Sequence, residues 1–208
     1  MKLVFATANK GKLKEAREIL AGIMEVVSPA DLGIFDELPE TAMTLEENSL
    51  QKAEGLKALC GLDCFADDTG LEVDALGGAP GAHAARFASD IARRDGLPLP
   101  ADHDFEANID TLLRELEKHP GEPRTARFRS VVTLLLGGRT LQFQGTLEGK
   151  IAFCRSGDKG FGYDPVFIAG DYPESSVAEL PEEVKNAISH RGKALRAMAQ
   201  WLKQNSSL

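Results

Sequence analysis

Cysteine, positive charge and long apolar runs are all scarce in this chain, and each shortage excludes a class of protein. Three cysteines in 208 residues are too few and too odd in number for a disulfide framework, so the chain suits a reducing compartment. The 24 lysines and arginines are outnumbered by 32 aspartates and glutamates, which gives a formal net charge of -8. Because neutralising nucleic-acid phosphates needs a basic surface, we expect no nucleic-acid partner.

No apolar run is long enough for a membrane span or a signal peptide. Residues 131–136 form one of the densest runs, far short of the ~18–20 residues that a membrane-spanning helix needs. The N-terminal run, residues 3–8, is shorter than the core of a signal peptide. We therefore expect a cytoplasmic protein without a membrane partner.

The composition is that of an ordinary globular protein. With 43% hydrophobic and 27% charged residues, a chain of this length can bury a core without disulfides or a structural metal. No internal repeat, low-complexity block or linker divides it. These features predict a single domain over residues 1–208.

Charge is distributed unevenly along the chain. Residues 36–74 hold eleven acids and two lysines, whereas residues 185–208 hold five lysines and arginines and no acid. The first fifteen residues hold four lysines and one acid. This pattern is compatible with ordinary surface variation, or with a site where carboxylates hold Mg²⁺ and cations hold the phosphate oxygens of a polyanion.

Hydrophobic periodicity predicts alternating strands and helices. Strands are expected at residues 3–6, 64–66 and 71–76, with a hairpin of residues 127–136 and 140–146 around Gly137-Gly138. Helices are expected at residues 12–21, 41–59 and 105–118, and after Pro181 and Ser189. Thr44 and Glu47 have the spacing of a capping box. Together these elements predict an α/β fold with a mixed sheet.

Several common nucleotide-binding and catalytic motifs are missing. There is no Walker A loop, no G-x-G-x-x-G after a strand, no G-x-S-x-G and no H-E-x-x-H. Four other segments remain as candidates. The first is the turn Thr7-Ala8-Asn9-Lys10-Gly11-Lys12, which would bind phosphate through backbone N–H groups, the Asn9 amide and the lysines, or would simply be a capped turn with solvated lysines.

The second candidate is Asp67-Asp68, which we expect at the end of the strand that begins at Cys64. Adjacent carboxylates repel each other unless a cation lies near them, so the pair suits a metal or a general base, or else a plain exposed turn. Glu46 and Glu47 would supply further metal oxygens, or only favourable charge in the first turn of a helix.

The third and fourth candidates offer aromatic faces and cations. Gly160-Phe161-Gly162-Tyr163-Asp164-Pro165 combines close-approach glycines with two rings that would stack on a flat base, or forms a turn with core aromatics. Lys185 and the segment Ser189-His190-Arg191-Gly192-Lys193 place donors around a helix start, or form a solvated basic face.

Taken in order, five segments resemble the noncanonical purine NTP pyrophosphatases, also called inosine/xanthosine triphosphate pyrophosphatases of the RdgB type. The segments are Thr7-Ala8-Asn9-Lys10-Gly11-Lys12, Phe65-Ala66-Asp67-Asp68-Thr69-Gly70-Leu71, Gly77-Gly78-Ala79-Pro80-Gly81 with Ala85-Arg86, Phe161-Gly162-Tyr163-Asp164-Pro165 and Ser189-His190-Arg191-Gly192. The resemblance covers residues 3 to about 202. It implies a single elongated α/β domain with a mixed central sheet and two lobes flanking a nucleotide-binding cleft, usually as a homodimer.

The resemblance also implies a reaction and a set of site residues. The reaction is Mg²⁺-dependent hydrolysis of ITP, dITP or XTP to the monophosphate and pyrophosphate. Asp68 would be the proton acceptor and a Mg²⁺ ligand, and Glu47 the second ligand, with Glu46 beside it leaving that position ambiguous by one residue. The implied substrate contacts are Thr7, Ala8, Asn9, Lys10, Gly11, Lys12, Thr69, Phe161, Gly162, Tyr163, Asp164, Lys185, His190 and Arg191.

Two other functions remain open from the sequence. One is a related pyrophosphatase for modified pyrimidine or ordinary nucleoside triphosphates, and the other is a nucleotide-binding regulator without turnover. The chain also departs from the resemblance at His83, where an aromatic residue often stands.

Overall fold

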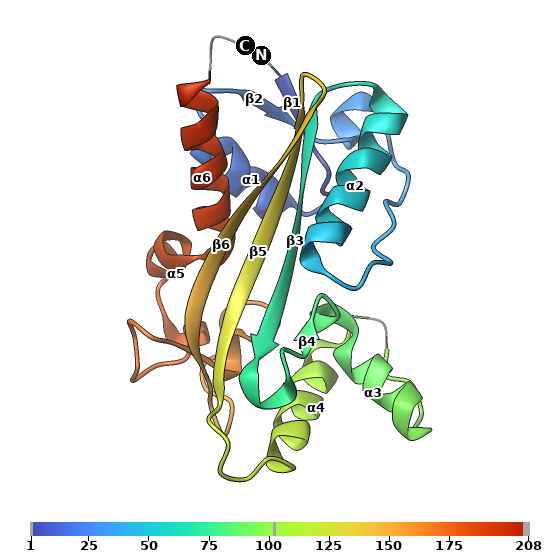
Figure 1. Cartoon of the computed structure of the whole chain (residues 1–208). Coiled ribbons are helices and arrows are strands. Elements are labelled where there is room, and N and C mark those ends of the chain that lie inside the picture. Colours follow the sequence, from blue (N-terminus) through green and yellow to red (C-terminus); the bar gives the residue numbers. More distant parts are fainter. Residues whose placement is uncertain (1, 102, 206–208) are drawn as a thin grey trace. The chain divides into compact units, whose positions relative to one another are not determined.

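Figure 1 shows the chain as a computed structural model, which describes residues 2–101 and 103–205. The described strands are β1 Lys2–Phe5, β2 Glu25–Val27, β3 Cys64–Val73, β4 Pro80–Gly81, β5 Thr125–Leu136, β6 Arg139–Ile151 and β7 Phe167–Ala169. The α-helices are α1 Lys10–Ile19, α2 Leu45–Cys60, α3 Phe87–Asp95, α4 Phe105–Glu117, α5 Glu182–Ile188 and α6 His190–Gln204. Short 3₁₀ helices lie at η1 Ala30–Leu32, η2 Asp74–Leu76, η3 Ala84–Arg86, η4 Asp164–Val166 and η5 Val177–Glu179.

The strands form a mixed sheet, which confirms the predicted fold class. Within the described residues its order is β2-β1-β3-β5-β6-β7, and β4 pairs with β3 off this path. Strand β1 is parallel to β2 and to β3, whereas β4 is antiparallel to β3 and β7 is antiparallel to β6. Among the helices of the described residues, none combines the length and the apolarity that crossing a bilayer requires.

Local signals in the sequence predict several element boundaries correctly. Gly137 and Gly138 have φ values of 56° and 77°, the left-handed backbone that a tight hairpin turn between β5 and β6 requires. The Thr44 side chain accepts the N–H of Glu47 at the start of α2. In the same way, Ser189 accepts the N–H of Gly192 and caps α6.

The prediction that the strand ends at residues 67–70 is wrong. Strand β3 continues without a break from Cys64 to Val73, and Asp67 and Asp68 lie inside it with exposed fractions of only 1% and 6%. Aspartate and glycine favour turns and often end a strand. Burying a carboxylate inside a strand is also costly unless it is paired. Here tertiary partners offset that cost, as the site geometry shows below.

The chain divides into two compact units. Unit 1 comprises residues up to 69, residues 129–146 and residues from 189 onward, and unit 2 comprises residues 70–128 and 147–188. Strands β3, β5 and β6 contribute residues to both units. Whether residues 1–208 behave as one domain stays a prediction.

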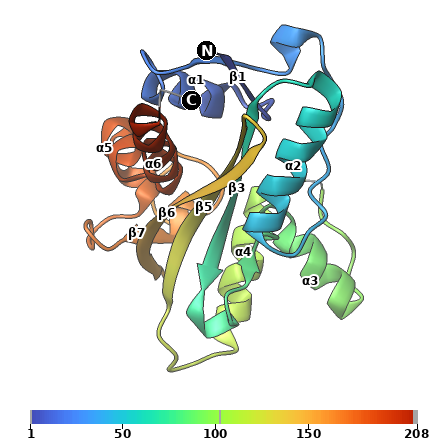
Figure 2. The same cartoon turned by 45° about the horizontal axis from the view of Figure 1, so that its top comes forward.

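In unit 1, helices cover both faces of the sheet. On one face, Phe65 of β3 packs in a cluster with Phe5 of β1, Ala16 of α1 and Leu195 of α6. On the other face, Cys64 and Ala66 pack with Ala53 and Leu56 of α2. Figures 1 and 2 show α2 on the opposite side of β3 from α6. Successive residues of β3 therefore meet different helices, as the two-residue repeat of a strand requires.

Unit 2 has a core of its own. Leu71 of β3 packs there with Phe87 of α3, Leu112 of α4 and Phe167 of β7, and with Tyr163 just before η4. Each unit thus buries a separate set of apolar side chains around its part of the shared strands.

Candidate functional site

The two adjacent aspartates of β3 point to opposite faces of the sheet. Asp67 shares the face of Phe65, where α1 and α6 pack, and its carboxylate contacts Lys12 and Arg191. Asp68 shares the face of Ala66, where α2 packs, and contacts Asn48 and Lys52. The strand repeat therefore separates two carboxylates that the sequence places side by side, and each has its own set of partners.

Asp67 forms ion pairs with two cations. Lys12 Nζ lies 2.9 Å from its Oδ2, and Arg191 Nε lies 3.3 Å from the same oxygen. Burial by itself raises the pKa of the Asp67 carboxyl, but the charges of Lys12, Arg191 and Lys52 outweigh burial and hold the pKa well below the usual 3.8. Asp67 is therefore a charged anchor that joins the first turn of α1 to the start of α6.

Asp68 has a different environment. Its Oδ2 accepts a hydrogen bond from Asn48 Nδ2 at 3.1 Å, and Lys52 Nζ lies 3.4 Å from its Oδ1. Burial raises the pKa of the Asp68 carboxyl, and the charge of Glu40 acts in the same direction, while Lys52 opposes both. A carboxylate with a raised pKa is a stronger proton acceptor than an exposed aspartate.

Lys52 links Asp68 to a second acid, Glu40. Lys52 Nζ lies 2.7 Å from Glu40 Oε1, and the lysine side chain is only 7% exposed. Burial opposes the charge of Lys52, yet the carboxylates of Asp68, Asp67 and Glu40 raise its pKa above the usual value. Two carboxylates thus bracket one buried cation on the α2 face.

Glu46 and Glu47 lie in the first turn of α2, where they bond to Arg129 and Thr44 rather than to Asp68. Glu46 Oε1 lies 2.5 Å from Arg129 Nη1, and this hydrogen bond lowers the pKa of Glu46. Glu47 is exposed and accepts a hydrogen bond from the Thr44 hydroxyl at 2.9 Å. The role of Glu47 as a metal ligand stays a prediction, while Glu40 is the acid that shares a partner with Asp68.

The turn over residues 7–12 caps α1. Asn9 Oδ1 accepts the N–H groups of Gly11 at 2.8 Å and Lys12 at 3.1 Å, and Thr7 Oγ1 accepts the N–H of Asn9. Two of the N–H groups expected to bind phosphate are thus taken by Asn9, as the capped-turn alternative predicts. Ala8 and Lys10 are exposed. The cations of this turn, rather than all of its N–H groups, are presented to a ligand.

Arg191 and its neighbours form the other end of the Asp67 network. Arg191 Nη1 lies 3.1 Å from Glu15 Oε2, and the Ser189 hydroxyl donates to Glu15 Oε1 at 3.1 Å. Burial, together with the charge of Arg191, lowers the pKa of His190 to about 3. His190 is therefore neutral at pH 7. Thr69 lies two residues after Asp67 and donates its hydroxyl to Ser130 at 3.2 Å.

In unit 2, the glycine-rich loop holds one exposed aromatic ring. Phe161 is 67% exposed and packs edge-on against Phe105, with ring centroids 4.3 Å apart. Its N–H donates to Asp164 Oδ2 at 3.0 Å, and a Cβ on Gly160 would lie only 2.2 Å from that oxygen. Gly162 has a φ of 62°. Asp164 therefore fixes the loop that presents Phe161.

Tyr163 and Lys185, also in unit 2, are two predicted substrate contacts whose side chains are buried or half-buried. Tyr163 is 4% exposed, and its hydroxyl donates to the Ala84 carbonyl at 2.8 Å. Burial raises the pKa of the Tyr163 hydroxyl. Lys185 is half-buried in α5. Of the two aromatics in the loop, only Phe161 exposes a face for stacking.

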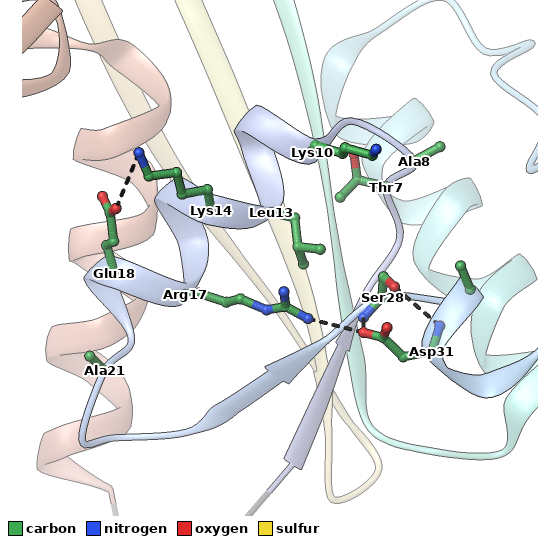
Figure 3. Close-up of a pocket in the computed structure, with 11 residues that line it drawn as sticks. Thr7, Ala8, Lys10, Leu13, Lys14, Arg17, Glu18, Ala21, Ser28 and Asp31 are labelled. Carbon is green, nitrogen blue, oxygen red and sulfur yellow. Dashed lines mark hydrogen bonds and ion pairs between the residues drawn. The ribbon is translucent and has the colours of Figure 1, made fainter.

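A cavity of about 760 Å³ lies beside the turn that precedes α1. Figure 3 shows Thr7 and Ala8 of the turn and Lys10 and Lys14 of α1 at its wall. The full lining is Thr7, Ala8, Lys10, Leu13, Lys14, Arg17, Glu18, Ala21, Ser28, Ala30 and Asp31. It includes neither aspartate of β3, so the cavity and the aspartate pair are separate features that share only this turn.

Asp68 carries the carboxylate oxygens that a hard divalent cation prefers as ligands. No three His, Cys, Asp or Glu side chains gather into a ready-made metal site in the part of the chain that the structure describes. Mg²⁺, however, is commonly held by one or two carboxylates together with water and substrate phosphates. Asp68 and Glu40, which share Lys52, supply two such carboxylates.

Sequence reasoning missed three members of this site. Asn48 and Lys52 contact Asp68, and Glu40 contacts Lys52. No sequence motif had indicated these three residues. The available signal was the spacing of Asn48 and Lys52, four residues apart on the side of α2 that also buries Leu56. A polar pair on the apolar face of a helix indicates a buried polar partner.

Known structures define the class of fold to which this α/β protein belongs. The Ham1 protein of Staphylococcus aureus aligns with a TM-score of 0.84 at 33% sequence identity, over 98% of this chain and 99% of that one. A HAM1 protein from Coxiella burnetii aligns with a TM-score of 0.86 at 32% identity, over the same shares. The mixed sheet with helices on its faces is thus the Ham1 fold.

Sequence comparison leads to the family itself. A model described as the Ham1 family matches residues 3–201, and the chain belongs to this family. A protein of Porphyromonas gingivalis named dITP/XTP pyrophosphatase is 47% identical over 204 residues, which cover 97% of this chain and 97% of that protein. A protein of the same name from Flavobacterium johnsoniae is 41% identical over 202 residues, which cover 97% of this chain and 98% of that protein.

Proposed function

We propose that this chain hydrolyses noncanonical purine nucleoside triphosphates, ITP, dITP and XTP, to the monophosphate and pyrophosphate. The observation that carries the proposal is Asp68, a buried carboxylate with a raised pKa, beside Lys52 and Glu40. Relatives that are 41% and 47% identical over almost their whole length carry the name dITP/XTP pyrophosphatase. Together these observations support a hydrolase that acts on a phosphoric anhydride.

In the proposed reaction, Asp68 accepts a proton from the water that attacks the α-phosphorus. A bond forms between the water oxygen and this phosphorus, the bond to the bridging oxygen of the β-phosphate breaks, and pyrophosphate leaves. A bound Mg²⁺ would draw charge from the phosphate oxygens, and Asp68 with Glu40 or Glu47 would hold it. Most of the rate enhancement would come from positioning and electrostatics.

The chain's cations would bind the triphosphate. Lys12 Nζ contacts both carboxylate oxygens of Asp67, and because an ammonium group has three N–H donors, at least one remains for a phosphate. Lys10 is exposed on the same turn. Asp67 would hold Lys12 in place, so that its remaining donors are oriented before a phosphate arrives.

Selection of the base would depend on hydrogen-bond direction. Hypoxanthine and xanthine carry a carbonyl at position six, whereas adenine carries an amino group there. Arg191 has only donors, and a neutral His190 has one ring N–H, so both would donate to the carbonyl. Adenine would set donor against donor and leave buried N–H groups unpaired, which costs far more than a missing methylene. Within unit 2, the exposed ring of Phe161 offers a flat face of the kind on which a base stacks.

The proposal includes a cytoplasmic location, a homodimer and a nucleoside triphosphate as the small-molecule partner. The homodimer follows from the resemblance to the family. The cytoplasmic location follows from the scarcity of cysteine, which suits a reducing compartment.

A nucleotide panel tests the proposed function. We expect pyrophosphate release from ITP, dITP and XTP well above that from ATP, GTP and pyrimidine triphosphates, and loss of release when Mg²⁺ is chelated. Preference for a pyrimidine triphosphate would favour the related pyrophosphatase instead. Binding of ITP without pyrophosphate release would favour a regulator without turnover.

A further inference from the structure

An ion pair of unit 1 joins α2 to the sheet outside the proposed reaction centre. Arg129 of β5 forms two contacts with the Glu46 carboxylate, Nη1 to Oε1 at 2.5 Å and Nη2 to Oε2 at 3.3 Å. Side chains in this geometry are held more firmly than in a single-point ion pair. The pair is also partly shielded from water, with exposed fractions of 20% for Arg129 and 33% for Glu46.

Two glutamines of β6 bind the same turn of α2. Gln144 accepts a hydrogen bond from Arg129 Nη1 at 3.3 Å and donates to Glu46 Oε1 at 3.4 Å. Gln142 donates to the backbone carbonyl of Glu46 at 3.0 Å and to the Thr133 hydroxyl, also at 3.0 Å. The set of Glu46, Arg129, Gln142 and Gln144 is called here the Glu46 clamp.

The Glu46 clamp lies next to the residues that contact Asp68. Asn48 and Lys52 follow Glu46 by two and six positions on α2, and they approach Asp68 at 3.1 Å and 3.4 Å. The Lys52 contact is already long. A displacement of α2 by about 1 Å along its axis would therefore break it, and misplacements of that size cost enzymes up to about a hundredfold in rate.

We infer that the Glu46 clamp is a positioning device, which holds α2 so that Asn48 and Lys52 orient Asp68. It also neutralises Glu46, which leaves Glu40 and Glu47 as the acids able to serve the divalent ion. The inference rests on the proposed function for its catalytic consequence. The structural consequence does not depend on the proposed function, because the Glu46 clamp orders α2 with or without substrate.

The kinetic test compares two arginines of the same strand. Arg129→Ala is expected to lower kcat for ITP by about tenfold or more while KM changes by less than about threefold, because chemistry rather than binding loses its alignment. Arg127 is the matched control, since it lies two residues away on β5 and pairs with Asp74 at 2.9 Å and Glu148 at 3.2 Å. Arg127→Ala is expected to lower the melting temperature without lowering kcat by more than about twofold.

A double-mutant cycle tests whether the two members of the ion pair act together. Glu46→Ala and Arg129→Ala are expected to lower kcat by similar factors, and the double variant by no more than either single variant. Losses that multiply in the double variant would overturn the inference. A kcat loss in Arg127→Ala as large as that in Arg129→Ala would overturn it as well.

Amide hydrogen exchange provides a readout that does not depend on activity. Exchange over residues 48–52 of α2 is expected to accelerate in Arg129→Ala and not in Arg127→Ala. Unchanged exchange in Arg129→Ala would overturn the clamp whatever the kinetics show. Wild-type protein that leaves every nucleotide intact would overturn the proposed function instead, and the exchange result would still decide whether the clamp orders α2.

Discussion

At the residue scale, Asp67 and Asp68 show how neighbouring residues of one type acquire different chemistry. The strand repeat turns them to opposite faces, and the helices on those faces differ in charge. Lys12 and Arg191 hold the pKa of Asp67 low, whereas burial raises the pKa of Asp68. One aspartate is thereby suited to structure and the other to proton transfer.

Replacing each aspartate by asparagine separates these two roles. Asp68→Asn is expected to lower kcat more than tenfold, with a melting temperature unchanged or higher, because a charge disfavoured by burial is removed. Asp67→Asn is expected to lower the melting temperature, because Lys12 and Arg191 lose their shared carboxylate. Retention of turnover within about tenfold in Asp68→Asn, only ~1.4 kcal/mol of barrier, would contradict its role as proton acceptor.

The second metal-binding acid is identified by its effect on the Mg²⁺ requirement. Glu40→Gln is expected to raise the Mg²⁺ concentration needed for half-maximal activity, because Glu40 shares Lys52 with Asp68. Glu54→Gln, at an exposed position of α2, is the control and should leave that concentration unchanged. The resemblance assigns this role to Glu47, so a rise in Glu47→Gln with none in Glu40→Gln would contradict the choice of Glu40.

Arg191 is expected to act on base recognition. Arg191→Ala should raise KM for ITP more than it changes the hydrolysis of ATP, because at position six only the 6-oxo base accepts a hydrogen bond from the guanidinium. Steady-state kinetics on both nucleotides measure the difference. Equal effects on ITP and ATP would remove Arg191 from base recognition and leave it with Asp67 and Glu15 alone.

At the element scale, the close approach of α6 to β6 depends on one glycine. A Cβ added at Gly145 would lie 2.1 Å from the His190 carbonyl oxygen and 2.5 Å from the Ala194 nitrogen. Both are backbone atoms, so no side-chain rotation relieves the clash. Gly145 therefore sets how near the first turn of α6, with His190 and Arg191, lies to the sheet.

Gly145→Ala is accordingly expected to destabilise the protein and to raise KM for ITP, because the first turn of α6 must shift. Gly55→Ala in α2 is the matched control, since its Cβ would approach only the flexible end of Leu38, at 3.3 Å. Alanine in a helix interior is favoured over glycine by about 1 kcal/mol, so that variant should be neutral or more stable. Thermal unfolding of the two variants measures the contrast, and equal melting temperatures would contradict it.

At the scale of the whole molecule, stability should fall in mild acid. His190 has a pKa of about 3 in the folded chain against a usual 6.5, so the unfolded chain binds the proton more tightly. The associated stability is present above about pH 6.5 and is lost as the pH falls toward 3. Asp67, whose pKa is lowered, adds a loss below its usual 3.8.

The pH dependence of the melting temperature tests this expectation. The wild-type value should decline steadily from pH 6.5 downward, and His190→Gln should decline less between pH 6.5 and 4, because glutamine does not titrate. Identical slopes for the two proteins would show that His190 is not held neutral. Arg191, Lys12 and Lys193 also face His190 with positive charge, and Asp67 with negative charge, and all four remain in the variant.

The sequence predicted much of the fold, while the roles of the site residues stay predictions. The hairpin at Gly137-Gly138 and the caps at Thr44 and Ser189 depend on local backbone chemistry, which one stretch of chain expresses by itself. The segment around Asp68 was found through motif order. The strand end predicted at Asp67-Asp68 was wrong, because the local tendency to end the strand was overridden by partners that come from α1, α2 and α6.

The amino-acid sequence by itself therefore determined the alternation of strands and helices, the helix caps and which residues carry charge. Only the tertiary structure decided which carboxylate meets which cation. Lys12, Lys52 and Arg191 are far apart in the sequence, and β3 sorts them onto two faces because its side chains alternate. The opposite pKa shifts of Asp67 and Asp68 arise from the different partners on the two faces, since both are aspartates of the same strand.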